Sequence, residues 1–359
     1  MRVDLALLGF GNVGRRFARL LVEQRERLLQ QYDLDWRIVG ISTRRHGSAF
    51  SLEGIDAIAA ASLVEQEGSL HAIHNARGTR PPMNGLELID LLGGAEGPLR
   101  VVLEMTTLDI SAGRPAIDHV SAALACGCDV ASVNKGPAAF AYHELQAEAK
   151  ASGRWFLFEG AVMDGVPVFN LVRETLPSVE ILGFRGVVNS TTNHILTALE
   201  DGQDFAPALA RMQEEGIAEA DPSLDVDGWD AAAKAAALAN ALMDARITPH
   251  DVRRTGIGPH TAAPARAAKS RGRRLRLVAA ATRGQQPIVE PIELPEDDLL
   301  AGLRGTANAL ILETDLLGQI AIYQLSGSLT QTAYALLSDL ITIRRRQRAR
   351  PEAPARQIP

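Results

Sequence analysis

The stretch "VDLALLGFGNVGRRFARLL" at residues 3–21 decides the fold of the first part of the chain. Apolar residues 3–8 predict a buried strand, and Phe17, Leu20 and Leu21 then recur at helical spacing. The turn between them has the GxGxxG pattern, which comprises Gly9, Gly11, Asn12, Val13 and Gly14. Such glycines permit a tight turn and close approach of a pyrophosphate to the helix N-terminus. We therefore predict an α/β fold with a Rossmann-like dinucleotide-binding domain.

The second expected strand, residues 36–42, indicates which dinucleotide binds. NAD enzymes usually end this strand with an acidic residue that binds the ribose 2′-hydroxyl, whereas this chain continues with Ser42, Thr43, Arg44 and Arg45. Guanidinium groups pair well with phosphate, so the two arginines favour NADP(H) over NAD(H). The alternative is that both arginines are solvated loop residues.

Two further expected strands, residues 100–106 and 129–133, end in polar side chains. Thr106 closes the first strand, and Asn134 and Lys135 follow the second. Because ligands of open parallel sheets bind at the carboxyl ends of the strands, we expect these three residues to face one crevice.

A second candidate site lies at residues 219–234, "EADPSLDVDGWDAAAK", which hold five carboxylates and one lysine. The helix expected at 231–243 contains eight alanines, and Lys234 is its only charge. Such an apolar helix is usually buried, so the ammonium must reach a cleft or pair with a carboxylate such as Asp230, four residues earlier. The pattern alone leaves an active-site lysine and an exposed ion pair equally open. A calcium loop is excluded, because Lys234 occupies the twelfth position, where a glutamate is needed.

Polar residues also follow two expected strands in the second half of the chain. Glu159 comes directly after an apolar strand, and the cluster Asn-Ser-Thr-Thr-Asn at residues 189–193 lies between a strand and a helix. Such a cluster offers helix caps and several side-chain donors. Pure capping is the alternative role.

The composition is ordinary for a globular protein: 359 residues, 46% hydrophobic and 22% charged. A net charge of −6 argues against a general nucleic-acid binder. No apolar run approaches the roughly 18–20 residues of a membrane span, and the N-terminal residues predict a strand rather than a signal peptide. Cys126 and Cys128 are expected to be reduced thiols. These features predict a cytoplasmic protein without nucleic-acid or membrane partners.

These pieces, in this order, resemble homoserine dehydrogenases. The family pattern of an acidic residue, D-P, a spacer and D-x-x-G-x-D-x-x-x-K is matched by Glu219, Asp221, Pro222, Asp225, Gly228, Asp230 and Lys234. Other stretches that look like family blocks are "SVNKGPAAF" (132–140), "FEGAVMDGVP" (158–167), "GVVNSTTNHIL" (186–196) and "LPEDDLLAGLRGTANALILETDLLG" (294–318). The resemblance covers residues 1–343 and favours the functional interpretation of Lys234.

The resemblance implies reversible, NAD(P)H-dependent interconversion of L-aspartate 4-semialdehyde and L-homoserine, a step of threonine, methionine and isoleucine biosynthesis. A hydride delivered to an aldehyde leaves an alkoxide, which needs a proton and nearby positive charge. By resemblance, Lys234 is the proton donor or acceptor, Asp230 orients it, and Lys135 binds or polarises the substrate. Further substrate contacts are implied for Glu219, Asp225 and Thr191, of which the two acids would hold the ammonium group.

The resemblance also implies a sodium ion near the junction of the two domains. Its ligands would be the Glu159 carboxylate and the main-chain carbonyls of Val162, Asp164 and Val166. Alkali ions suit oxygen ligands. The alternative is that Glu159 pairs with a backbone amide or a basic group.

The expected architecture is an NAD(P)-binding domain at residues 1–134, onto which a final helix at 330–343 packs back. An α+β catalytic and dimerisation domain with an open sheet is expected at 135–329. The arginine- and proline-rich residues 344–359 are expected to be disordered and too short for the regulatory amino-acid-binding domain of many family members. The resemblance implies a homodimer or larger homo-oligomer.

One departure from the family pattern affects the functional prediction. Residues 324–328, Gln-Leu-Ser-Gly-Ser, stand where the family commonly has a glycine-rich loop before its last helix. Two alternatives follow: a related dehydrogenase of another small amino or hydroxy acid, and an inactive dinucleotide-binding regulatory protein. The intact set Lys135, Asp230 and Lys234 argues against the second alternative.

Overall fold

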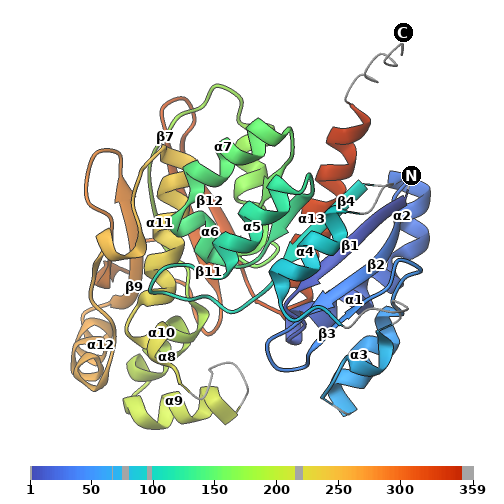
Figure 1. Ribbon diagram of the computed structural model, residues 1–359. Coiled ribbons are helices and arrows are strands. Elements are labelled where there is room, and N and C mark those ends of the chain that lie inside the picture. The colour runs from blue at the N-terminus through green and yellow to red at the C-terminus, as the bar shows by residue number, and fades with distance from the viewer. Residues whose placement is uncertain (1, 67, 75–80, 95–98, 215–220, 350–359) are drawn as a thin grey trace.

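The computed structural model describes residues 2–66, 68–74, 81–94, 99–214 and 221–349, whose strands form two six-stranded sheets. In spatial order, the first sheet consists of β3 (Ser48–Phe50), β2 (Asp35–Ser42), β1 (Arg2–Leu8), β4 (Leu99–Glu104), β5 (Asp129–Ser132) and β6 (Phe156–Leu157). All of these strands are parallel except β3, which runs antiparallel to β2. Figure 1 shows this sheet on the right and the second sheet on the left.

Helices cover both faces of the first sheet, as a parallel sheet with apolar strands requires. One face carries α4 (Gly85–Gly93), α5 (Ala116–Ala125) and α7 (Tyr142–Ser152), and the other carries α1 (Asn12–Glu23), α2 (Arg25–Tyr32), α3 (Ala57–Gln66) and α13 (Leu329–Arg348). This doubly covered parallel sheet confirms the predicted Rossmann-like part of an α/β fold. The expected boundary at residue 134 falls inside the sheet, between β5 and β6.

The glycine-rich turn has the geometry that its glycines require. Gly9 has φ +93°, and a Cβ there would lie 2.5 Å from the carbonyl oxygen of Met105. A Cβ on Gly14 would lie 2.7 Å from the carbonyl oxygen of Gly9, whereas one on Gly11 would meet no atom of the described residues within 4 Å. The first and third glycines therefore permit close packing, and the second faces open space where a ligand can approach the backbone.

The second sheet contains, in spatial order, β12 (Gly318–Gln324), β11 (Asn308–Thr314), β7 (Ile181–Val187), β9 (Arg273–Thr282), β10 (Ile288–Pro295) and β8 (Arg253–Arg254). Its pairs are antiparallel except β8 with β10. The core side chains on one face, including Leu277 and Leu310, pack against the helices α8 (Ser190–Glu200), α11 (Trp229–Met243) and α12 (Ala262–Ser270). This α+β part matches the predicted open sheet with helices.

The remaining helical segments connect these layers. They are η1 (His71–Ile73), α6 (Lys135–Phe140), η2 (Glu159–Ala161), η3 (Leu171–Thr175), α9 (Phe205–Glu214), α10 (Ser223–Val226), η4 (Pro249–Asp251) and η5 (Pro259–Thr261). Within the described ranges, none of the helices has the length and apolar character needed to span a membrane.

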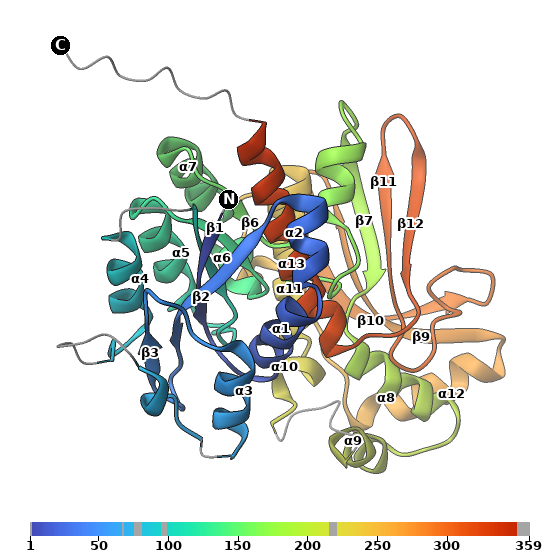
Figure 2. The same ribbon diagram turned by 90° about the vertical axis from the view of Figure 1, so that its right-hand side faces the viewer.

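Helix α13 runs between the two sheets and packs on α1 and α2 (Figure 2). It continues five residues beyond the expected 343, so the prediction of a disordered segment is wrong for residues 344–348. The physical reason is that the arginines of this turn have partners: Arg344 pairs with Asp33, Arg345 lies over Tyr32 and Arg346 over Trp155. Residues 350–359 lie outside the described ranges.

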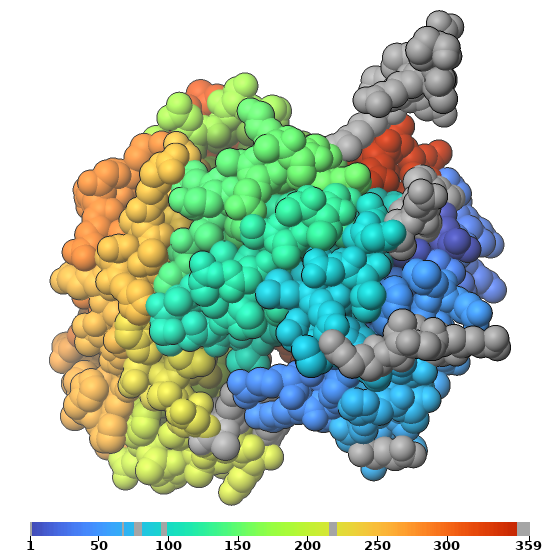
Figure 3. Space-filling view, in the orientation of Figure 1, coloured from blue at the N-terminus to red at the C-terminus, as the bar shows by residue number. Residues whose placement is uncertain are grey.

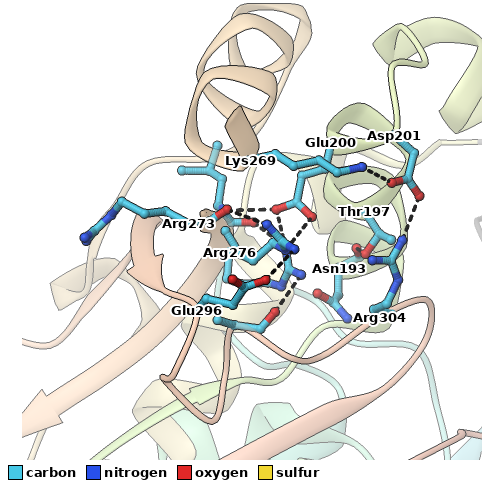
Figure 4. A network of polar contacts seen from close by, with 12 residues as sticks. Asn193, Thr197, Glu200, Asp201, Lys269, Arg273, Arg276, Glu296 and Arg304 are labelled. Carbon is cyan, nitrogen blue, oxygen red and sulfur yellow. Dashed lines mark hydrogen bonds and ion pairs between the residues drawn. The ribbon is translucent and has the colours of Figure 1, made fainter. Parts of the chain in front are cut away.

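The two parts of the chain are in contact where α11 meets α6 and α7, and Figure 3 shows a small gap in the surface between blue and teal residues of the first part. In the second part, α8 is tied to β9 by an ion pair between Glu200 and Arg276 at 2.7 Å, with side chains 1% and 0% exposed (Figure 4). Arg276 also donates to the carbonyl of Ala301. Removing one partner of such a buried pair typically costs about 3–5 kcal/mol, so this network holds the helix firmly on the sheet.

Candidate active site

Asp230 joins two lysines that come from opposite parts of the fold. Its Oδ1 lies 3.1 Å from Nζ of Lys135, and its Oδ2 lies 2.9 Å from Nζ of Lys234. Lys135 is the first residue of α6, and Asp230 and Lys234 lie one turn apart at the start of α11. Lys234 also donates to the carbonyl of Val188. With side chains 13–23% exposed, the three form a largely buried cluster rather than a solvated surface pair.

Asn189 links this cluster to Asp225. Its Nδ2 donates to Asp225 Oδ1 at 2.6 Å and to Asp230 Oδ2 at 2.9 Å. Its Oδ1 accepts the backbone N–H of Thr192, so the same side chain caps α8. Thr191 follows in the first turn of α8, and its side chain opposes the rise in the pKa of Asp225. The polar cluster at 189–193 thus caps α8 and also contacts the acids Asp225 and Asp230.

The electrostatics of the cluster follow from burial and close charges. Burial opposes ionisation of Asp230, but Lys135 and Lys234 outweigh it and hold the pKa of its carboxyl well below the usual range. Burial likewise opposes the charge on Lys135, yet Asp230, Asp225 and Asp164 keep its pKa above the ordinary value. Burial and the negative charge of Asp230 raise the pKa of Asp225. Asp230 is therefore a permanent anion between two ammonium groups.

The carboxyl ends of β4 and β5 are joined by hydrogen bonds of Asn134, the residue before Lys135. Nδ2 of Asn134 donates to the carbonyl of Thr106 at 2.9 Å, and its Oδ1 accepts the N–H of Gly136 at 2.8 Å. The backbone N–H of Thr106 donates in turn to Glu104, at 2.8 Å. Thr106 and Asn134 thus contact each other at the carboxyl ends of β4 and β5, and Lys135 follows Asn134 directly. Sequence reasoning gave Glu104 no role, although a carboxylate inside the apolar strand 100–106 is a signal for one.

Glu104 is completely buried, and its Oε2 lies 2.7 Å from Nδ1 of His119 on α5. The carboxylate therefore holds Thr106 on one side and the imidazole on the other. A fixed strand end of this kind gives Thr106 a defined position at the sheet edge where a dinucleotide binds.

The first helix offers a free N-terminus for a dinucleotide. Among the residues that the structure describes, no side chain caps α1, whose N-cap residue is Gly11. Uncapped N–H groups and the helix dipole favour a phosphate group at this point. Asn12 and Val13 form the first turn of α1, and Arg44 and Arg45 are exposed in the loop after β2. The residues present therefore fit a dinucleotide phosphate.

Glu159 is buried, and its carboxylate accepts three backbone N–H groups. Oε1 accepts from Val168 at 2.6 Å and Phe169 at 2.9 Å, and Oε2 accepts from Asn170 at 2.7 Å. This is the backbone-amide pairing that the sequence left open as an alternative to cation binding. Burial outweighs these bonds and raises the pKa of Glu159.

Two of the other residues predicted as cation ligands, Asp164 and Val166, also take part in hydrogen bonds. The N–H of Val166 donates to the carbonyl of Met163, and the side chain of Asp164 accepts from Gln324 and Thr332. Val162 is buried nearby. No group of three or more histidine, cysteine or acidic side chains suited to a metal occurs in the described residues. Glu219, the other predicted ammonium-binding acid, lies outside the described residues.

Comparisons with known proteins identify the family. The model of the NAD-binding domain of homoserine dehydrogenase matches residues 9–159, and the model of homoserine dehydrogenase itself matches residues 167–341. The NAD(+)-dependent homoserine dehydrogenase of Pseudomonas canavaninivorans is 36% identical over 94% of this chain and 95% of its own length. The homoserine dehydrogenase of Methanocaldococcus jannaschii is 36% identical over 95% of this chain and 98% of its own.

Solved structures agree with this assignment. A hyperthermophilic archaeal homoserine dehydrogenase mutant in complex with NADPH superposes with a TM-score of 0.80 at 28% identity, covering 96% of this chain and 98% of that one. A homoserine dehydrogenase from Thiobacillus denitrificans superposes with a TM-score of 0.79 at 27% identity, covering 100% and 76%. On the sequence matches, the chain belongs to the homoserine dehydrogenase family of NAD(P)-dependent oxidoreductases.

Proposed function

We propose that this chain interconverts L-aspartate 4-semialdehyde and L-homoserine at the cluster of Lys135, Asp230 and Lys234. The observation that carries this assignment is the pair of contacts from one aspartate to two lysines, at 3.1 and 2.9 Å. When bound, the reduced nicotinamide supplies a hydride to the aldehyde carbon, and its oxidised form takes the hydride back from the alcohol. The residues of the chain must therefore supply one proton and stabilise one developing negative charge.

Lys234 is the proposed proton donor in the reductive direction. Its ammonium is held between Asp230 and the carbonyl of Val188, so the side chain has a defined position. It would pass a proton to the alkoxide oxygen and recover it from solvent, and in the oxidative direction it would accept the alcohol proton. Lys135 keeps its charge because of Asp230 and would stabilise the same oxygen electrostatically.

The acids around the lysines fit the ammonium group of an amino-acid substrate. Asp225 is positioned by Asn189 and Thr191, and a substrate cation beside it would offset the burial and the repulsion from Asp230 that raise its pKa. We propose Asp225 and Glu219 as ammonium ligands and Thr191 as a further substrate contact. This charge arrangement favours a small amino-acid substrate over a simple hydroxy acid.

We propose NADP(H) as the preferred cofactor, with Gly9, Gly11, Asn12, Val13 and Gly14 at the pyrophosphate and Thr106 near the nicotinamide end. Support comes from the exposed guanidinium groups of Arg44 and Arg45, which can pair with a 2′-phosphate. The family includes an NAD(+)-dependent relative at 36% identity, so the preference rests on these two side chains.

We also propose a sodium ion with Glu159 as its side-chain ligand and main-chain carbonyls of Val162, Asp164 and Val166 as further ligands. The support is a pair of buried carboxyl groups: Oδ2 of Asp339 accepts the N–H of Glu159, and Oδ1 of Asp339 has no hydrogen-bond partner among the described residues. A cation would offset the desolvation of these two acids. The three N–H groups on Glu159 leave it little further capacity, so carbonyl oxygens would supply most of the coordination.

The domain organisation is proposed from the two sheets. Residues up to about 158, together with α13, would bind the dinucleotide, and the residues of the second sheet and its helices would carry catalysis and the contacts of a homodimer or larger homo-oligomer. We place the protein in the cytoplasm, since the unpaired cysteines Cys126 and Cys128 suit a reducing compartment.

Turnover tests the assignment directly. Purified protein with L-homoserine and NADP should produce the absorbance of the reduced nicotinamide, and D-homoserine and small hydroxy acids should give far less product. Folded protein that binds NADP but turns over a hydroxy acid in preference to L-homoserine would contradict the substrate assignment.

A further inference from the structure

The loop at residues 324–328 is held by side-chain contacts in the place where the family commonly has glycines. Gln324, the last residue of β12, is 3% exposed, whereas Leu325 is 82% exposed. The loop ends at Ser328, which caps α13 by accepting the N–H of Gln331. One end of an exposed loop is therefore fixed by a buried amide side chain.

Gln324 connects two parts of the site. Its Nε2 donates to Oδ2 of Asp164 at 2.8 Å, and its Oε1 accepts from Nδ2 of Asn308 at 3.1 Å. Asn308 donates also to the hydroxyl of Ser190, at 2.9 Å, in the polar cluster beside Asn189. A continuous chain of hydrogen bonds thus runs from the start of α8 through Gln324 to Asp164.

Asp164 ends this chain of hydrogen bonds. Its Oδ1 accepts from Thr332 of α13 at 3.0 Å, so both carboxylate oxygens have donors from the C-terminal segment. A Cβ on Gly327 would lie 3.0 Å from Oδ2 of Asp164, which places the loop backbone directly against the carboxylate. The negative charge of Asp164 is one of those that keep the pKa of Lys135 above its ordinary value.

The same segment also contacts helix α1, which follows the glycine turn. The hydroxyl of Thr330, in the first turn of α13, accepts from Nε of Arg16 on α1 at 2.9 Å. The start of α13 is therefore bonded on one side to the helix that would receive the pyrophosphate and on the other, through Thr332, to Asp164.

We propose that Gln324 is a positioning residue for the cofactor: its hydrogen bond to Asp164 holds the 324–328 loop and the start of α13 in the place needed to bind NADP(H) beside Lys135. The proposal rests on the dehydrogenase function proposed above. Gln324 touches neither reacting atom. Losing this bond therefore raises the KM and Kd for NADP(H) and changes kcat little.

The decisive experiment exchanges donor and acceptor. Gln324→Glu places two carboxylates 2.8 Å apart and is expected to weaken NADPH binding about tenfold or more. In the double variant Asp164→Asn with Gln324→Glu, an amide again donates to a carboxylate, so NADPH affinity should return to within about threefold of Asp164→Asn alone. Gln324→Ala, without the repulsion, is expected to show a smaller loss of about three- to tenfold.

Gln319→Glu is the matched control, since Gln319 is exposed on the same strand. It should bind NADPH like the wild type. The proposal is overturned if Gln324→Glu behaves like this control, or if its penalty is the same in the wild-type and Asp164→Asn backgrounds. NADPH affinity is measured by nicotinamide fluorescence, which needs no turnover. Failure of the wild type to oxidise L-homoserine would instead count against the proposed function, and the two failures are thereby distinguished.

Discussion

Lys135 and Asp230 form a 3.1 Å ion pair between the end of the first sheet and the alanine-rich helix α11 of the second part. The contact is more than packing, because the same carboxylate binds Lys234 through its other oxygen. One aspartate thus sets the spacing of two ammonium groups that come from different parts of the chain. A site assembled in this way can stabilise an oxyanion and exchange a proton with it, which is what carbonyl reduction needs.

Asn189 is expected to matter for catalysis beyond its capping role. Asn189→Asp keeps an oxygen for the Thr192 N–H but turns a third carboxylate toward Asp225 and Asp230. We predict a loss of kcat/KM of about a hundredfold for Asn189→Asp, and a loss of stability at least as large as in Asn189→Ala, which loses the cap at about 1 kcal/mol, because the added carboxylate is buried beside two acids. Steady-state kinetics and urea unfolding of both variants give the comparison.

Asn84→Ala is the matched control for Asn189, because Asn84 caps α4 by accepting the N–H of Glu87 and lies away from the acids. It should lose stability without losing activity. Wild-type activity in Asn189→Asp, together with equal activity losses in Asn84→Ala and Asn189→Ala, would show that capping alone explains Asn189.

Replacing Arg44 and Arg45 together by alanine should raise the KM for NADP about tenfold or more and leave that for NAD nearly unchanged. The reason is that only NADP has a 2′-phosphate for the guanidinium groups. Arg27→Ala, an exposed arginine on α2, should change neither value. An equal rise in KM for NADP and NAD would show that the arginines bind both cofactors without selecting the 2′-phosphate. An unchanged KM for both would show that they are solvated loop residues.

The buried carboxyl of Asp339 predicts a dependence of stability on pH. Burial, followed by repulsion from Glu159, raises its pKa in the folded protein to about 8. Because the unfolded chain releases this proton at lower pH, the folded state binds more protons between about pH 4 and 8. Stability contributed by protonated Asp339 is therefore present in acid and is lost as the pH rises toward 8.

Asp339→Asn should accordingly lose less stability than the wild type when the pH is raised from 5 to 8, with a difference of up to about 1.4 kcal/mol per pH unit. Urea unfolding at several pH values measures it. Asp297→Asn, at an exposed position, should follow the wild type. Parallel curves for Asp339→Asn and the wild type would show that Asp339 does not keep its proton.

Sodium is expected to stabilise the folded chain. A ligand that binds only the native state raises the melting temperature with its concentration. Melting in sodium chloride should therefore occur at higher temperature than in choline chloride at the same ionic strength, and the increase should saturate. Identical melting curves in the two salts would contradict the proposed sodium site. The role of Glu159 would then be to cap the segment that leads into η3.

The predictable and unpredictable parts of the fold differ in their physical origin. Local patterns were sufficient for the glycine turn, the apolar strands β1 and β2, and the Asp230–Lys234 pair, whose four-residue spacing on one helix face fixes its contact. The Lys135–Asp230 contact was not predicted, because no local pattern relates two residues so far apart in the chain; the family resemblance implied only that each has a role at the substrate. The strand before Glu159, β6, was expected from the sequence, but no local pattern shows that it pairs with β5, which is why the boundary at 134 fell inside the sheet.

Side-chain partners from distant segments were also beyond the sequence. The arginines at the end of α13 looked like a solvated tail because their partners, such as Asp33 and Trp155, lie far away along the chain. The bond from Gln324 to Asp164 likewise joins a hairpin end to a loop between the two sheets. Only the folded arrangement brings these groups together.

The central claim is that Lys234 exchanges the proton in homoserine dehydrogenation, and one measurement tests it most directly. The absorbance of reduced nicotinamide is followed with L-homoserine and NADP for the wild type, Lys234→Ala and the exposed-lysine control Lys150→Ala. We predict turnover by the wild type and by Lys150→Ala, and a rate lowered about a hundredfold or more in Lys234→Ala that still binds NADP. A folded wild type without turnover, or a Lys234→Ala variant as fast as the control, would contradict the account.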